Sequence, residues 1–113
     1  MTNDDKSASH QTSDYNLLSD EEVRVFSDQM PEWSAKEKLI SRLFEFKDFD
    51  QAMDFTMKVA DVARQENHHP EICINYNKVL IQLSTHKVGG LTRKDFKVAS
   101  RIDSIITNEV QSD

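Results

Sequence analysis

Residues 72–86, ICINYNKVLIQLSTH, carry the pattern that decides the fold. Apolar and polar side chains alternate on both sides of a polar interruption at Asn77-Lys78. Such alternation is typical of two strands joined by a tight turn, with one apolar face and one mixed face. The sequence therefore predicts an antiparallel hairpin with its turn near Asn77-Lys78. Cys73, within this hairpin, is interpreted as a small packing residue of the sheet.

A second pair of strands is predicted nearer the N-terminus. Trp33-Ser34-Ala35 forms a short strand, residues 36–38 turn, and residues 39–46, LISRLFEF, form a longer one. In the longer run Ile40 and Phe44 share one side, and the content of aromatic and branched residues favours a strand over a helix. The chain thus supplies four strands, in two consecutive pairs.

Three helices are predicted from their first turns. Each begins at a side chain that can accept a hydrogen bond from the backbone of that turn, followed three residues later by an acid or an amide. The pairs are Ser19 with Glu22, Asp48 with Gln51, and Thr92 with Asp95. The order is α-β-β-α-β-β-α, which predicts an α+β fold: a four-stranded antiparallel sheet with three helices packed on one face. Val98 is placed on a flank of the apolar stripe of the third helix.

The second helix has an unusually wide apolar arc. Its apolar residues sweep roughly 220° of the circumference at ~100° per residue, more than one sheet face usually covers. Either the helix is wedged between the sheet and another helix, or part of it meets a second subunit. Both alternatives remain open at this point.

Composition excludes several classes of protein. The 113 residues carry a net charge of −6, which argues against a nucleic-acid partner, because phosphate binding needs a basic patch. No apolar run approaches the ~20 residues that cross a bilayer, so no membrane span is expected. The single Cys allows no intrachain disulfide and suits a reducing, cytoplasmic location. Residues 1–14 lack branched aliphatic and aromatic side chains and are expected to be a disordered tail, with one domain over residues 15–113.

The histidines are the main candidates for function. His68 and His69 follow the second helix, and His86 ends the last strand. Loops and element ends are where a rigid scaffold presents chemistry, and the C-terminus of a helix favours an imidazolium. Two imidazoles that exchange protons near neutral pH suit a dehydration, in which one group protonates the leaving hydroxyl and another removes a proton.

Simpler explanations exist for the same residues. Asn67 and the histidines could merely end a helix and neutralise its dipole, and Asp95 suits the first turn of a helix without any further role. Three His and one Asp could also bind zinc with an open fourth position. Adjacent histidines point in different directions, however, and no HExxH pair occurs, so no metal site is predicted.

Several short motifs together resemble the pterin-4a-carbinolamine dehydratase family. They are His68-His69-Pro70-Glu71, Tyr76-Asn77-Lys78-Val79, Leu83-Ser84-Thr85-His86, Gly90-Leu91-Thr92 and Asp95. The resemblance implies a hydro-lyase that converts 4a-hydroxytetrahydropterin, left by an aromatic amino-acid hydroxylase, to quinonoid dihydropterin and water. It also implies that no metal or organic cofactor takes part, and that the chain forms a homodimer or a homotetramer through its helices.

The resemblance also implies roles for individual residues. His68, His69 and His86 match the three active-site histidines of the family. His68 and His86 are expected to be the acid/base pair at the 4a-hydroxyl and ring N5, while His69 positions the pterin and Asp95 tunes the histidines. The other positions that match the substrate pocket are Asn67, Pro70, Ser84, Thr85 and Lys87.

The chain departs from the family pattern at three positions. Arg64 replaces a frequent acid, Asn67 replaces a frequent Asp, and Ile72 replaces a common aromatic residue. These changes spare the histidines but alter the charge and shape expected of the pocket. Two other roles stay open: a non-enzymatic one, because animal members of the family bind a homeodomain transcription factor, and a role in another pterin pathway such as molybdopterin metabolism.

Overall fold

The computed structural model describes the backbone of residues 14–112 and the side chains of residues 14–107. The tail expected over residues 1–14 lies outside the described residues, apart from Asp14. The elements in order are α2 (Asp20–Gln29), β1 (Ser34–Lys36), β2 (Leu39–Glu45), α3 (Phe49–Glu66), β3 (Glu71–Asn75), β4 (Lys78–Leu83), the short 3₁₀ helix η1 (His86–Val88) and α4 (Arg93–Ser112).

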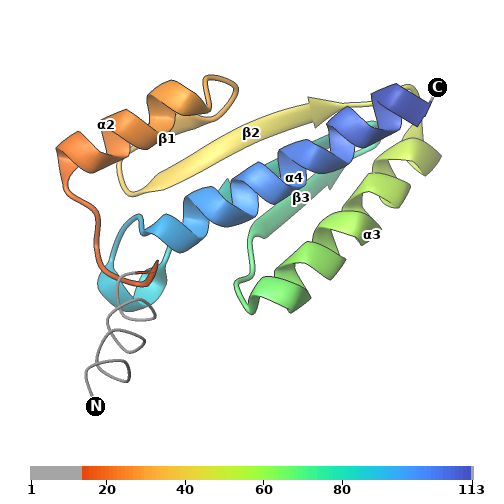
Figure 1. Ribbon diagram of the computed structural model, residues 1–113. Helices are drawn as coiled ribbons and strands as arrows, with labels where there is room; N and C mark the ends of the chain where they lie inside the picture. Colours follow the sequence, from red (N-terminus) through yellow and green to blue (C-terminus); the bar gives the residue numbers. More distant parts are fainter. Residues whose placement is uncertain (1–13, 113) are drawn as a thin grey trace, which may run out of the picture.

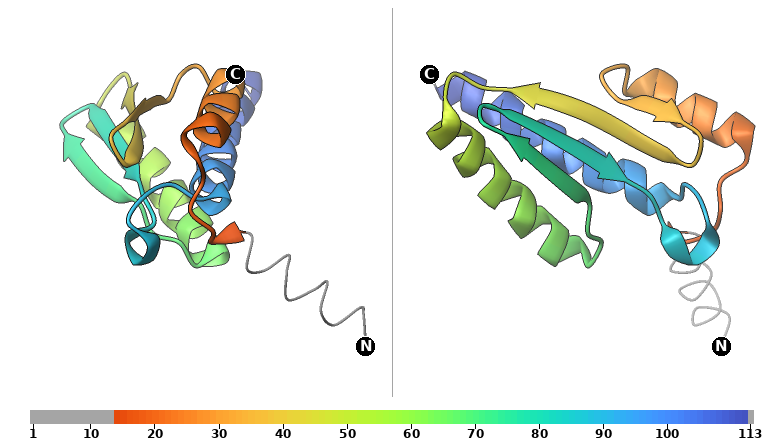
Figure 2. Two further views of the ribbon diagram at one scale, coloured as in Figure 1. Left: turned by 90° about the vertical axis from the view of Figure 1, so that its left-hand side faces the viewer. Right: turned by 180° about the vertical axis from the view of Figure 1, so that it is seen from behind.

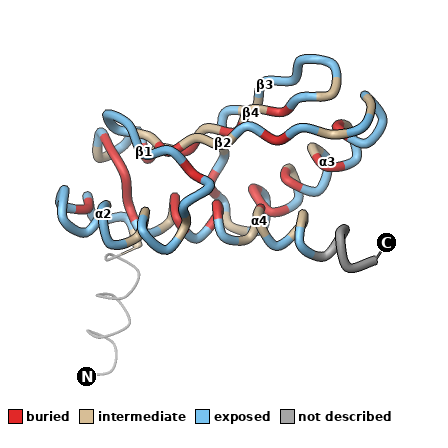
Figure 3. Tube along the Cα trace, turned by 90° about the horizontal axis from the view of Figure 1, so that it is seen from above, coloured by how far each residue is buried: buried red, intermediate tan, exposed pale blue. Residues whose placement is uncertain are grey.

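The strands form one antiparallel sheet in the order β1-β2-β4-β3 (Figure 1). The three helices lie on one face of the sheet, as the views from behind and from above show (Figures 2 and 3). The predicted α+β class and the order α-β-β-α-β-β-α are confirmed. β4 lies in the interior of the sheet and pairs with β2 on one side and β3 on the other.

Side-chain caps fix where α2 and α3 begin. Ser19 Oγ accepts a hydrogen bond from the backbone N–H of Glu22 at 3.1 Å, and Glu22 returns one to the N–H of Ser19 at 2.9 Å. Asp48 Oδ1 accepts from the N–H of Gln51 at 2.9 Å, while the Gln51 side chain accepts from the N–H of Lys47. These caps confirm the predicted helix starts, and they satisfy backbone donors that a helix leaves unpaired.

The core lies between the sheet and the helices, where the buried residues face one another (Figure 3). The strands contribute alternate residues, with Ile40 opposite Leu83 and Phe44 opposite Val79 in the β2–β4 register. Phe55 of α3 packs its ring 4.7 Å from that of Phe44. The apolar side chains predicted to face the core from β2 and β4 are therefore the buried ones.

Four local details of the prediction were wrong. The hairpin turn lies at Tyr76-Asn77, since Asn75 pairs with Lys78 and Tyr76 takes a left-handed backbone with φ of 54°. Cys73 is exposed, because β3 is an edge strand and its outer face is uncovered in the described chain. Val98, assigned to a flank, is fully buried.

The remaining wrong detail concerns the end of β4. This strand finishes at Leu83, so His86 does not end a strand but begins η1. The backbone N–H of Thr85 donates to Gly90 O at 2.8 Å, which closes the loop that contains η1. His86 therefore lies on a short, tied loop beyond the sheet.

The wide apolar arc of α3 has two parts. One part is buried against the sheet and α4, and comprises Ala52, Phe55, Val59, Val62 and Ala63. The other leaves Phe49 and Met57 exposed, at 45% and 59%, with the half-buried Met53 between them. Packing among residues 14–107 accounts for the first part of the arc and leaves this stripe of Phe49, Met53 and Met57 uncovered.

Candidate active site

The C-terminus of α3 and the chain beyond β4 meet at one end of the sheet. Asn67 ends α3 in the left-handed conformation, with φ of 52°, as predicted for a helix terminator. The N–H of His68 then donates to Ala63 O at 3.1 Å, which fixes the backbone of the histidine pair. Backbone hydrogen bonds thus tie both segments, at His68 after α3 and at Thr85 after β4.

A cavity of about 540 Å³ opens between these two segments. It is lined by Tyr15, Asn67, His68, His69, Ser84, Thr85, His86 and Lys87. The structure therefore brings the three candidate histidines to one concavity, although His86 is remote from the other two in sequence. Pro70 is not among the lining residues, and it follows the pair at the entry to β3.

A buried carboxylate holds one of the histidines. Nε2 of His68 lies 2.6 Å from Oδ1 of Asp95, which is fully buried at the start of α4. The other carboxylate oxygen accepts hydrogen bonds from Thr85 Oγ1 at 2.7 Å and from the backbone N–H of Thr92 at 2.9 Å. An ionised carboxylate only accepts, so Nε2 of His68 donates and Nδ1 is the ring nitrogen left for another partner.

The two remaining histidines differ from His68 in exposure and in hydrogen bonding. His69 and His86 are both exposed, and within residues 14–107 neither imidazole has a hydrogen-bond partner. Their ring nitrogens are therefore available to a molecule that enters the cavity, and they can exchange protons with water. One oriented imidazole and two accessible ones form a group suited to moving protons.

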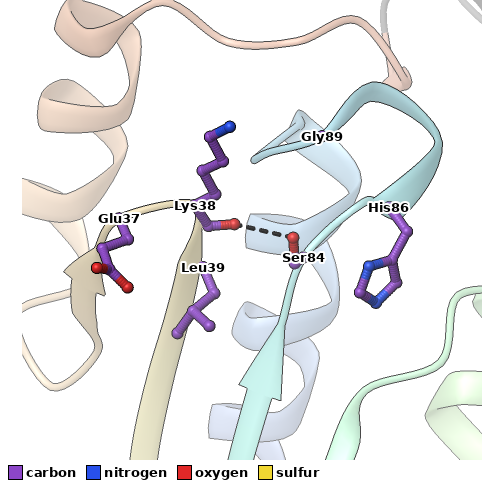
Figure 4. A pocket seen from close by; sticks show the side chains of 6 residues that line it. All are labelled: Glu37, Lys38, Leu39, Ser84, His86 and Gly89. Carbon is purple, nitrogen blue, oxygen red and sulfur yellow. Dashed lines mark hydrogen bonds between the residues drawn. The ribbon is translucent and has the colours of Figure 1, made fainter.

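A second hollow lies on the other side of the chain that leaves β4. It has a volume of about 720 Å³ and is lined by Glu37, Lys38, Leu39, Ser84, His86 and Gly89 (Figure 4). Ser84 Oγ donates to the carbonyl oxygen of Lys38 at 2.8 Å, which ties the two chain segments together. In Figure 4 the ring of His86 lies on the opposite side of the Ser84 segment from Glu37, Lys38 and Leu39. His86 therefore borders both this hollow and the cavity that it shares with His68 and His69.

The sequence analysis did not identify Tyr15 as a cavity residue, and it did not place Arg64 relative to the cavity. Tyr15 lines the cavity, yet its only sequence signal is an aromatic residue at the border of the polar tail. Arg64 is exposed and pairs with Asp61 at 2.9 Å, so it does not line the histidine cavity. Its replacement of an acid consequently changes the surface of α3 rather than the cavity wall.

The described part of the chain offers neither a metal site nor a membrane span. Over these residues no group of three or more His, Cys, Asp or Glu side chains is placed to hold a metal ion. None of the described helices is both long enough and apolar enough to cross a membrane.

Comparison with known proteins gives a consistent result. The family described as pterin 4 alpha carbinolamine dehydratase matches residues 16–105. A relative from Sulfurisphaera tokodaii, provisionally named pterin-4-alpha-carbinolamine dehydratase, is 43% identical over 90 residues, which cover 80% of this chain and 97% of the relative. One from Picosynechococcus with the same provisional name is 46% identical over 88 residues, which cover 78% and 96%.

A solved structure supports the same assignment. It is the transcriptional coactivator/pterin dehydratase from Brucella melitensis, with a TM-score of 0.76 and 34% sequence identity. The match covers 80% of this chain and 98% of that one. The chain therefore belongs to the pterin 4 alpha carbinolamine dehydratase family, a family of hydro-lyases.

Proposed function

We propose that this protein dehydrates a 4a-hydroxytetrahydropterin to quinonoid dihydropterin and water, with histidines as the general acid and base. The observation that carries the proposal is that three imidazoles from two separate segments line one cavity of about 540 Å³. Family membership supplies the substrate class, and the cavity supplies groups that suit the chemistry.

The reaction needs two proton movements and no change of oxidation state. The C4a–O bond breaks as the hydroxyl takes a proton and leaves as water. The N5–H bond also breaks, and N5 forms a double bond to C4a. One positioned acid and one positioned base therefore suffice, and a positioned acid or base contributes typically ~10²–10⁴-fold to a rate. No organic cofactor and no metal enters this scheme.

The proposed pair is His68 and His86, acting at the 4a-hydroxyl and at N5. His68 is held by Asp95 through Nε2, so Nδ1 is the nitrogen that would face the pterin. His86 and His69 are exposed, and His69 is proposed to position the pterin.

The other predicted pocket residues are proposed to support this arrangement. Thr85 lines the cavity, but its hydroxyl is used by Asp95 and Thr92, so it orders the buried cluster more than it binds substrate. Asn67 and Pro70 set the path of the chain around the histidine pair. Ser84 and Lys87 lie on the cavity wall, where their polar groups can meet the polar edges of a pterin.

The biological setting is proposed from the same chemistry. An aromatic amino-acid hydroxylase leaves a 4a-hydroxytetrahydropterin, so dehydration would return that pterin to a form that can be reduced again. We also propose a cytoplasmic homodimer or homotetramer. The uncovered stripe of Phe49, Met53 and Met57 on α3 is the surface that favours assembly, since exposed apolar patches mark interaction sites.

The test is a dehydration assay on 4a-hydroxytetrahydropterin generated in situ. The wild-type protein should accelerate the reaction, and His86→Ala should lower kcat by roughly 10²–10⁴-fold. His10→Ala is the matched control, because it removes the histidine that has no assigned role, and it should leave kcat unchanged. A near-normal rate for His86→Ala would remove His86 from the mechanism.

A non-enzymatic role is the second candidate. The Brucella melitensis relative is described as a transcriptional coactivator as well as a pterin dehydratase. The uncovered stripe on α3 would offer a surface for a protein partner. A wild-type protein with all three histidines that gives no rate enhancement in the dehydration assay would favour this role over the enzymatic one.

A further inference from the structure

Tyr15 forms part of the wall of the histidine cavity, from a segment remote in sequence from the rest of that wall. The chain that leads into α2 runs down beside η1, as the views in Figures 1 and 2 agree. The ring of Tyr15 lies 6.4 Å from the ring of His68, centroid to centroid, and the two planes are tilted by 57°. With 40% of its surface exposed, Tyr15 is not a core residue.

The backbone near Tyr15 is held by contacts to the loop between η1 and α4. The N–H of Leu18 donates to Leu91 O at 2.9 Å, and the Leu18 side chain is buried. Leu17 lies so close to Gly90 that a Cβ there would be 2.7 Å from Leu17 Cδ1. Gly90 therefore leaves room for this segment, and Tyr15 is only three residues from a fixed point.

A lysine holds the ring from outside the cavity. Lys94 Nζ lies 5.6 Å from the centroid of the Tyr15 ring, within the range of a cation–π interaction. The same ammonium group bonds to Glu66 at 3.1 Å, and Glu66 also accepts a hydrogen bond from Arg101 at 2.8 Å. Lys94 is thus fixed by the network between α3 and α4, and it restrains the Tyr15 ring in turn.

We propose that Tyr15 is a substrate-positioning residue whose ring stacks on the bicyclic ring of the pterin. The inference rests on the proposed function for the identity of the ligand. Flat aromatic rings prefer offset or tilted stacking with centroids ~4.5–7 Å apart, and Tyr15 is the one residue with a phenyl ring among the described residues that line the cavity. Tyr15 also lies just outside residues 16–105, so the shared family pattern does not account for it.

The experiment compares three variants in the dehydration assay and in calorimetric binding of 7,8-dihydrobiopterin. Tyr15→Ala should raise KM and the Kd of dihydrobiopterin about tenfold, the scale of losing one aromatic stacking partner, and leave kcat within about twofold. Tyr15→Phe keeps the ring and should match the wild type within about twofold. Tyr76→Ala is the matched control, because Tyr76 is 64% exposed on the turn at the other end of β4.

Each outcome decides one question. An unchanged KM and Kd for Tyr15→Ala would overturn the inference, and so would a Tyr15→Phe variant as weak as Tyr15→Ala, because the hydroxyl rather than the ring would then matter. A wild-type protein that binds dihydrobiopterin through Tyr15 but does not dehydrate the carbinolamine would refute the proposed function and leave the role of Tyr15 standing. Circular dichroism of each variant separates misfolding from a binding defect.

Discussion

Replacing Asp95 by Asn tests whether the buried carboxylate orients His68. The two side chains have nearly the same shape, so the change alters hydrogen bonding without opening a cavity. Thr92 N–H and Thr85 Oγ1 both donate to one carboxylate oxygen, at 2.9 Å and 2.7 Å. The Asn carbonyl must therefore take that position, and its NH₂ group is left to face Nε2 of His68.

The Asn NH₂ group facing Nε2 reverses the direction of the hydrogen bond between residue 95 and His68. Nε2 can then only accept, so the ring proton moves to Nδ1, the nitrogen proposed to face the pterin. Loss of a charge-assisted hydrogen bond costs about 1.5–3 kcal/mol, part of which the new amide bond restores. We expect the free energy of unfolding to fall by about 1–2 kcal/mol and kcat to fall by roughly 10²–10⁴-fold, the contribution of one positioned acid or base.

The measurements are kcat from the dehydration assay, the free energy of unfolding from urea denaturation, and the His68 tautomer from long-range ¹H–¹⁵N NMR. Asp103→Asn is the matched control. Asp103 accepts hydrogen bonds from Trp33 Nε1 and from Arg42, away from the cavity, and burial raises its pKa despite these bonds. Its neutralisation should leave kcat unchanged.

Two results would refute the reasoning about Asp95. An Asp95→Asn protein with wild-type kcat and a proton still on Nε2 would show that the carboxylate does not set the tautomer. An equal loss of kcat in Asp103→Asn would show that neutralising any half-buried or buried acid on α4 disturbs the activity, so that Asp95 has no special relation to His68.

Further predictions concern stability and metal dependence. Burial alone would raise the pKa of Glu66, but hydrogen bonds from Arg101 and Lys94 outweigh it and hold the pKa below its ordinary value of 4.5. The ionised form of Glu66 therefore stabilises the fold, so Glu66→Gln should unfold at a lower urea concentration than the wild type at pH 7. This difference should close as the pH falls below 4.5. A difference that stays constant with pH would show that the ionised Glu66 does not stabilise the fold. Phe55→Ala empties a fully buried position and should lower the free energy of unfolding by about 3–5 kcal/mol in urea denaturation. Gly89 has φ of 71° and open space around it, so Gly89→Ala should cost about 1 kcal/mol in thermal unfolding through backbone strain alone. Added EDTA should leave kcat unchanged, and inhibition reversed by Zn²⁺ would restore a metal site to consideration.

The parts of the fold that were predictable are those set by local chemistry. Ser19 with Glu22 and Asp48 with Gln51 are contacts between residues three apart, so the sequence alone shows which backbone donors they satisfy. Alternation places Ile40 on the buried side of β2 in the same way. The turn after β3 was misplaced by one residue because Tyr76, a typical strand residue, takes the left-handed position there.

Some contacts between distant segments left no signal in the sequence. Tyr15 lines a cavity whose other residues lie far along the chain, and its position depends on the bond from Leu18 to Leu91. Hydrophobic periodicity does not reveal such a contact, because the contact arises from how α2 packs onto the rest of the domain. The exposure of Cys73 has the same origin, since only the strand order places β3 at the edge of the sheet.

Asp95 shows why a structural and a functional explanation of one residue need not compete. As a helix N-terminal acid it needs one oxygen, which accepts from the N–H of Thr92. The second oxygen is then fixed in direction and meets His68 Nε2 at 2.6 Å, 27 residues away in sequence. The cap thus orients the carboxylate, and the carboxylate orients the imidazole. Asn keeps the oxygen that caps the helix and replaces the oxygen that meets His68. Asp95→Asn consequently separates the capping role from the role at His68.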